Sequence, residues 1–173
     1  MPATRSDLFA RLAELGIETE TAEHEPVFTV EEARKLRGEI PGGHCKNLFL
    51  KDKKGNLWLV VALEDARIDL KGLPAIIGSG RLSFGKPELL MEALGIEPGS
   101  VTPFAIINDT DNRVTVVLDK AMMEEPLLNY HPLGNDATTT IGADDLVAFI
   151  RSCGHEPHIL AVSEGLSEPA QGL

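Results

Sequence analysis

Two apolar runs in the middle of the chain give its clearest pattern. Residues 46–52 (KNLFLKD) and 57–63 (LWLVVAL) flank the polar turn sequence KKGN. Short apolar runs on either side of a Gly-containing turn predict a β-hairpin. Because side chains alternate along a strand, every second residue should face one side. The residues expected to do so are Leu48, Leu50, Leu57, Leu59 and Val61.

Five other segments have the spacing and end signals of helices. Thr4 or Ser6 can cap the first helix, in which leucines recur at helical spacing. Thr29 stands three residues before Glu32, a capping-box pattern for the second. Proline at the first turn and glycine at the end mark residues 86–95. The five predicted segments are 6–16, 29–38, a short helix within 69–80, 86–95 and 143–154.

The remaining patterned segments predict strands. They are residues 17–24, 103–109, 112–119, 127–131 and 155–162. Helices and strands mix without a strict βαβ rhythm, so the fold class is α/β in the mixed α+β sense, with an antiparallel or mixed sheet. The length predicts one domain over residues 1–173, and the polar segment 163–173 is expected to fray.

Composition changes this picture little. The chain is 43% hydrophobic and 25% charged, as in ordinary globular proteins. The sequence has no run of about 18 apolar residues, so no membrane helix is expected. The N-terminal residues lack the apolar core of a signal peptide. Cys45 and Cys153 fit a reducing compartment. The sequence therefore predicts a cytoplasmic protein without a membrane partner.

Charge is distributed unevenly along the chain. The net charge of −11 argues against a nucleic-acid partner. Residues 34–86, however, hold eleven of the sixteen Lys and Arg but five of the twenty-seven Asp and Glu. Such a basic middle could be a local docking face for phosphates, or its lysines could simply lie on solvated turns.

The segment GGHCKNLFL, residues 42–50, gathers four chemically capable side chains where the first hairpin strand begins. Cys45 could be a thiolate nucleophile. His44 is poorly placed to activate it, because neighbouring residues on a strand face opposite sides, and cysteine is often a small buried filler. Lys46 could present its ammonium to a phosphate or a polarised carbonyl, or be a surface lysine.

His131 precedes Pro132 and is therefore held extended. The residues after it are rich in hydroxyl groups, and Thr138 could belong to a strand's polar face or to a site wall. His131 could equally be structural. Cysteines and histidines show no zinc-binding spacing, and the phosphate-binding glycine motifs are absent from the sequence, so neither a metal nor a cofactor is expected.

Four segments in order resemble a known family. They are CKNLFLKDKKGNLWLVV, GRLSFGKPELLMEALGIEPGSVTPFAIIND, VTVVLD and HPLGNDATTTI. They are similar to the YbaK/ProX group of aminoacyl-tRNA deacylases, related to the editing insertion domain of bacterial prolyl-tRNA synthetase. The likeness runs from about residue 24 to residue 160 and is strongest to the free-standing ProX (PrdX-like) proteins, which are associated with hydrolysing alanine wrongly attached to proline tRNA.

The resemblance implies a curved, partly barrel-like mixed sheet with surrounding helices, and no metal. It implies ester hydrolysis by a positioned water in a trans-acting enzyme that binds the acceptor end of mischarged tRNA(Pro), with prolyl-tRNA synthetase as a second partner. The residues that it implies for catalysis are Lys46, Asn47 and His131. Those that it implies for binding substrate or tRNA are Arg81, Ser100, Thr102, Asp109 and Thr138.

Lys46, Asn47, Arg81 and His131 are therefore expected to converge on one concave pocket. Three alternatives remain at this point. The substrate could carry cysteine or serine instead of alanine, since small side chains are poorly distinguished by a pocket. The protein could be a non-catalytic tRNA- or nucleic-acid-binding module. It could also be a hydrolase that uses Cys45 as nucleophile.

Overall fold

The structure is a computed structural model that describes residues 2–26 and 40–163. The helix predicted over 29–38 and almost all of the predicted tail at 163–173 lie outside these residues. The helices are α1 (Arg5–Glu14), α3 (Leu73–Ile77), α4 (Pro87–Leu94) and α5 (Ala143–Ser152), with short 3-10 helices η1 (Pro98–Ser100), η2 (Pro103–Asn108) and η3 (Met122–Glu124). The strands are β1 (Glu20–Glu23), β2 (Gly43–Asp52), β3 (Leu57–Leu63), β4 (Leu82–Phe84), β5 (Val114–Asp119), β6 (Leu127–Tyr130), β7 (Ala137–Gly142) and β8 (His158–Leu160).

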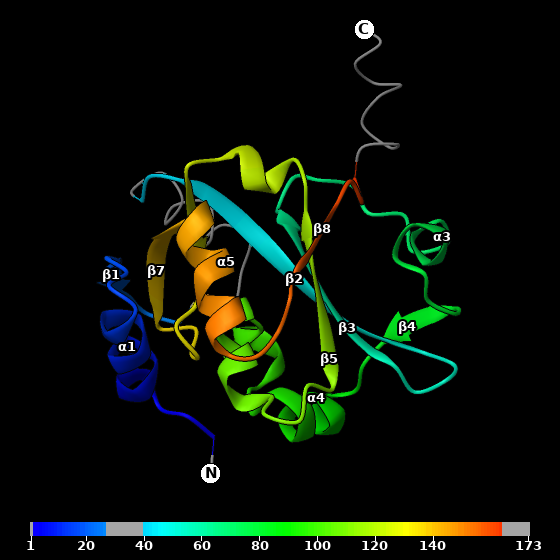
Figure 1. Ribbon diagram of the computed structural model, residues 1–173, viewed down its shortest axis with the longest axis horizontal. Helices are drawn as coiled ribbons and strands as arrows, with labels where there is room; N and C mark the ends of the chain where they lie inside the picture. The colour runs from blue at the N-terminus through cyan, green and yellow to red at the C-terminus, as the bar shows by residue number, and fades with distance from the viewer. Residues whose placement is uncertain (1, 27–39, 164–173) are drawn as a thin grey trace, which may run out of the picture.

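Eight strands form one mixed sheet, which confirms the predicted fold class. Its order is β1-β7-β6-β2-β3-β5-β8, and β4 pairs with β2 beside this path. β2 is antiparallel to β3 and parallel to β6, and β3, β5 and β8 run parallel. The described strands leave the sheet open, with β1 and β8 at its ends. Figure 1 shows α1 and β1 on one side of the molecule and α3 and β4 on the other.

The predicted hairpin is confirmed, and its register corrects one detail. Phe49 pairs with Leu59 and Leu50 pairs with Trp58. The turn between the strands has four residues, so even-numbered residues of β2 pair with even-numbered residues of β3. Paired residues share a face of the sheet. Leu48 and Leu50 therefore face the side opposite to that of the odd-numbered residues of β3. Leu57, Leu59 and Val61 pack in the large core with Phe49, whereas Leu50 packs in a second cluster with Val60 and Leu73.

The helices of the described residues follow their sequence signals. Thr4 caps α1, accepting a hydrogen bond from the backbone of Asp7 while the Asp7 side chain accepts one from the backbone of Thr4. Leu8 and Leu12 are the buried residues of α1, whereas Leu15, the C-cap of this helix, is 40% exposed. Gly95 ends α4 in the left-handed conformation, with φ of 67°.

The strand predicted over 103–109 is wrong, because this segment forms η2. Pro103 lacks a backbone donor and its ring fixes a helical φ, and the Thr102 hydroxyl accepts from the backbone N–H of Phe104 at 3.3 Å. Phe104, Ala105 and Ile106 are all buried. A short, wholly buried apolar run has no periodicity that separates a helix from a strand.

Candidate functional site

One edge of β2 is interrupted where Lys46 and Asn47 lie. The other edge pairs with β3 from Cys45 to Lys51. The interrupted edge pairs with β6 at Gly43 and His44 and with β4 from Leu50 to Asp52. On that edge the Phe49 carbonyl still accepts a hydrogen bond from Gly85, which follows β4, at 2.9 Å. Within the described residues no strand pairs with positions 45–48 there. Lys46 and Asn47 therefore occupy an unpaired stretch between two neighbouring strands.

The Lys46 ammonium points toward the segment that follows β3. Its Nζ donates a hydrogen bond to the carbonyl oxygen of Ala66. Lys46 is only partly buried, and a lysine ammonium has three donors. This bond therefore fixes the side chain and leaves N–H groups for a ligand.

Asn47 faces the opposite side of β2, because adjacent strand residues alternate. It pairs with Val61, whose side chain belongs to the large core. Its Oδ1 is buried and, among the described residues, has no hydrogen-bond partner. A buried acceptor without a hydrogen bond costs free energy. A ligand that donates a hydrogen bond to this oxygen would remove that cost.

His131 follows β6 directly and has one ring nitrogen fixed. Its Nδ1 lies 3.0 Å from the carbonyl oxygen of Ala137. A carbonyl only accepts, so Nδ1 carries the hydrogen, and the neutral ring offers its Nε2 as an acceptor. Burial lowers the pKa of His131, the bond to Ala137 opposes this, and the charges of His24 and Arg5 lower it further. The neutral form is thus favoured.

His24 and Thr138 adjoin His131. The ring centroids of His24 and His131 are 6.5 Å apart. Nε2 of His24 lies 2.9 Å from Oγ1 of Thr138, and Nδ1 of His24 lies 2.8 Å from the carbonyl oxygen of Glu25. The structure thus brings together His131 and Thr138, both singled out in the sequence. His24 also belongs to this group, although the sequence analysis did not single it out. No local sequence pattern could identify it, because the pairing of β1 with β7 brings it next to Thr138.

The parallel register of β2 and β6 relates Lys46 to His131. His44 pairs with Asn129, and Lys46 and His131 each follow that pair by two positions. Residues two apart share a face of a sheet. Lys46 and His131 are therefore directed to the same face at the β2–β6 junction.

Arg81 does not join these residues. It is exposed and precedes β4, whose Leu82 pairs with Asp52. Asp52 lies six residues along β2 from Lys46, a distance of about 20 Å along a strand. Arg81 thus lies at the other end of β2.

Three further candidates occupy structural positions or a separate groove. Asp109 is 3% exposed and accepts hydrogen bonds from the backbone of Arg113 and Val114 and from Nε2 of His155. Thr102 is fully buried as the cap of η2. Ser100 lines a groove of about 710 Å³ over α4 and η1, and neither Lys46 nor His131 lines this groove.

The environment of Cys45 disfavours a nucleophile. Burial raises the pKa of its thiol to about 12, although hydrogen bonding to Tyr130 and the backbone of Asn129 partly opposes this. His44 points elsewhere, with its Nε2 3.1 Å from the carbonyl oxygen of Ile40. The thiolate that a nucleophile requires is therefore scarce at neutral pH.

Neither a metal site nor a membrane span is found in the described part of the chain. Across residues 2–26 and 40–163, no three His, Cys, Asp or Glu side chains are grouped to hold a metal ion. In the same residues, no helix is long and apolar enough to cross a membrane.

Comparison with known proteins gives a consistent result. The aminoacyl-tRNA editing domain matches residues 24–149. The chain is 42% identical over 161 residues to the prolyl-tRNA synthetase associated domain-containing protein 1 of Bos taurus, covering 90% of this chain and 94% of that protein. It is 40% identical over 149 residues to the prolyl-tRNA editing protein ProX of Acetoanaerobium sticklandii, covering 86% of this chain and 91% of that protein.

A solved structure agrees on the fold. The crystal structure of a protein described as a proposed trans-editing enzyme for prolyl tRNA synthetase matches with a TM-score of 0.68 at 20% sequence identity. The match covers 92% of this chain and 98% of that one. At this identity the likeness shows the fold alone.

Proposed function

Because the chain belongs to the aminoacyl-tRNA editing domain family, we propose that it is a trans-acting deacylase that hydrolyses mischarged tRNA(Pro), with Ala-tRNA(Pro) as its substrate. The observation that carries the proposal is the position of Lys46 on a stretch of the β2 edge that no strand of the described residues pairs with, and His131 is directed to the same face. A fixed ammonium and a neutral imidazole are groups that ester hydrolysis can use.

In the proposed reaction, a water oxygen attacks the ester carbonyl carbon. The Nε2 atom of His131 accepts a hydrogen bond from that water and takes its proton as the new bond forms. Lys46 donates to the carbonyl oxygen as negative charge develops there. The bond to the ribose oxygen then breaks, and the proton passes from His131 to that oxygen. Free amino acid and intact tRNA are the products.

Asn47 has a separate role in this proposal. Where no described strand pairs with the edge of β2, the proposed ligand would contact side chains on both faces. The buried Oδ1 of Asn47 would accept a hydrogen bond from the α-ammonium group of the aminoacyl ester. This contact would orient the ester against Lys46, so that the carbonyl meets the water in one geometry.

The test is deacylation of tRNA(Pro) charged with alanine, cysteine or serine, and of correctly charged Ala-tRNA(Ala), by the purified protein. The proposal predicts release of alanine from tRNA(Pro) and sparing of Ala-tRNA(Ala). Faster hydrolysis of the cysteinyl or seryl ester would reassign the substrate. Binding of tRNA without hydrolysis of any ester would favour a non-catalytic module and contradict the proposal.

A further inference from the structure

The turn that follows His131 is held by a side chain from α1. Arg5, in the first turn of that helix, donates from Nε to the carbonyl oxygen of Pro132 at 3.0 Å. Its Nη2 donates to Oδ1 of Asp136 at 2.5 Å. The two acceptors stand near the two ends of the turn between β6 and β7. One guanidinium therefore spans this turn, because arginine offers its N–H groups in a fixed planar fork.

The backbone of this turn adopts a conformation that needs support. Leu133 has a φ of 70°, a left-handed conformation that is unfavourable for leucine and persists only where the surroundings hold it. Its N–H donates to the carbonyl oxygen of His131 at 2.9 Å. At Gly134, a Cβ atom would lie 2.8 Å from Nη2 of Arg5, so the guanidinium lies directly against the backbone. Arg5 thus contacts Pro132 and Gly134, the residues on either side of the strained one.

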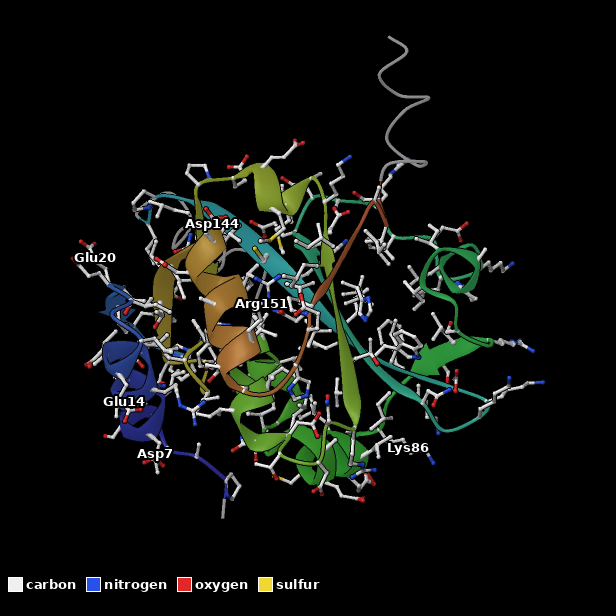
Figure 2. The ribbon with its side chains drawn as sticks, viewed as in Figure 1. Asp7, Glu14, Glu20, Lys86, Asp144 and Arg151 are labelled. Carbon is white, nitrogen blue, oxygen red and sulfur yellow. The ribbon has the colours of Figure 1, made fainter. Side chains whose placement is uncertain are left out.

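Arg5 is itself placed by contacts at the start of α1. Figure 2 labels Asp7, whose side chain forms the capping box of this helix with Thr4. The backbone N–H of Ala3 donates to Oδ1 of Asn108 at 2.6 Å, which ties the start of α1 to η2. Figure 1 shows α1 on the same side of the molecule as β1 and β7. The first turn of α1 is therefore fixed independently of the turn that Arg5 holds.

Four charged or titratable groups face His131 from the elements around it. Arg5 comes from α1, His24 follows β1, Asp136 precedes β7, and Lys46 of β2 is directed to the same face. Burial lowers the pKa of the ring most, the charges of His24 and Arg5 lower it further, and the carboxylate of Asp136 raises it. Since a guanidinium disfavours a second positive charge beside it, Arg5 helps to keep the ring neutral.

We propose that Arg5 is a positioning residue for deacylation, which holds the turn at His131 so that Nε2 of the ring meets the attacking water. This inference rests on the proposed function. The editing domain matches residues 24–149, so Arg5 reaches the site from outside the matched region. Its contacts are with the turn, and it acts on the reaction through His131. A displacement of about 1 Å at a catalytic group can cost about a hundredfold in rate, so an arginine away from the ester can control turnover.

The first measurement is kcat/KM for Ala-tRNA(Pro) between about pH 5 and about pH 8. Arg5→Ala removes both the hydrogen bonds and the charge. Its plateau of kcat/KM near neutral pH should fall by about ten- to a hundredfold, and its acidic limb should move to higher pH because the ring no longer lies beside a cation. Arg5→Lys keeps the charge but loses the fork of donors. It should lower the plateau and leave the limb near its wild-type position.

The second measurement is an NMR titration of the His131 ring without substrate. The protein has five histidines, so the ring signal of His131 is identified by its loss in the His131→Asn protein. The pKa of His131 should rise in Arg5→Ala and stay close to the wild-type value in Arg5→Lys. Asp136→Asn should lower this pKa, because the carboxylate that raises it is gone. Shifts in opposite directions from the two partners of one ion pair are not expected from a loss of packing.

Arg11→Ala serves as the control. Arg11 is also partly buried on α1, and its Nη1 lies 3.5 Å from Oγ of Ser152 and 3.5 Å from Sγ of Cys153. The variant removes the same charge from the same helix without touching the turn. Its plateau, its acidic limb and the pKa of His131 should therefore match the wild type.

The outcomes separate this inference from the proposed function. A wild-type protein that hydrolyses no ester would overturn the proposed function, and the NMR titrations would still support or overturn the effect of Arg5 on the His131 ring. An active wild type whose plateau and His131 pKa are both unchanged by Arg5→Ala would overturn the inference alone. So would a lower plateau with an unchanged pKa, because a merely structural role would act in that way. An equal fall with Arg11→Ala would assign the effect to α1 as a whole and would also overturn it.

Discussion

Nδ1 of His131 lies 3.0 Å from the carbonyl oxygen of Ala137, and this bond determines which ring nitrogen can accept a proton. The contact joins the end of β6 to the start of β7, so the strand pair itself sets the tautomer. A neutral imidazole with a free Nε2 is what the proposed reaction requires of this residue. Three neighbouring charged or titratable groups, His24, Arg5 and Asp136, act on its pKa.

The pH dependence of deacylation should report this histidine. Burial lowers the pKa of His131 from 6.5, so the ring is neutral at pH 7 and becomes protonated only in more acidic solution. We expect kcat/KM to be constant near neutrality and to fall as the pH drops through the lowered pKa. The measurement is kcat/KM between pH 5 and about 8.

His131→Asn is the matched variant, because its amide nitrogen lies as far from Cβ as Nδ1 does and can still donate to the carbonyl of Ala137, but it does not titrate. It should have low activity without the acidic limb that the wild type shows. An unchanged acidic limb in this variant would assign the titration to another group.

Cys45→Ala should leave catalysis intact. Burial raises the pKa of the thiol to about 12, so kcat/KM should change by less than about twofold, because little thiolate is present to act. Single-turnover deacylation by the two proteins measures this. Loss of hydrolysis in the variant, with its melting temperature preserved, would restore the nucleophile hypothesis.

Asp109 should matter for stability rather than for the site. Its carboxylate bonds to His155 Nε2 at 2.8 Å, and both side chains are buried. Asp109→Ala should cost about 3 kcal/mol or more of unfolding free energy, because the backbone of Arg113 and Val114 and the ring of His155 would lose their acceptor, at about 1–3 kcal/mol for each buried donor left unpaired. Denaturant unfolding measures it, with Asp111→Ala as a control in the same loop, where an exposed acid should contribute within about 0.5 kcal/mol.

Activity of the folded Asp109→Ala protein separates this structural role from a direct role in binding substrate. Below its unfolding transition, it should hydrolyse the ester at a rate close to the wild type. If the variant is fully folded but binds tRNA more weakly, Asp109 has a direct role in binding substrate, which would contradict this prediction.

The sequence predicted what local patterns determine. Alternation and turn residues identified the hairpin over 46–63, and the resemblance singled out Lys46 on it. Contacts between distant segments could not be predicted in this way. Thr138 bonds to His24 across 114 positions, and the break between β6 and β4 depends on three strands meeting along β2. The segment 103–108 was ambiguous because its first four residues are all buried, so burial shows no periodicity there.

The central claim is that Lys46 acts on the ester itself. Its most direct test is kcat for Lys46→Ala at saturating Ala-tRNA(Pro), with Lys53→Ala as the matched lysine variant. If Lys46 stabilises the developing oxyanion, kcat should fall by about a hundredfold, whereas Lys53→Ala should mainly raise KM and flatten its salt dependence. The claim would be contradicted if Lys46→Ala kept the wild-type kcat and changed only KM and the salt slope, since Lys46 would then be one more phosphate-binding cation.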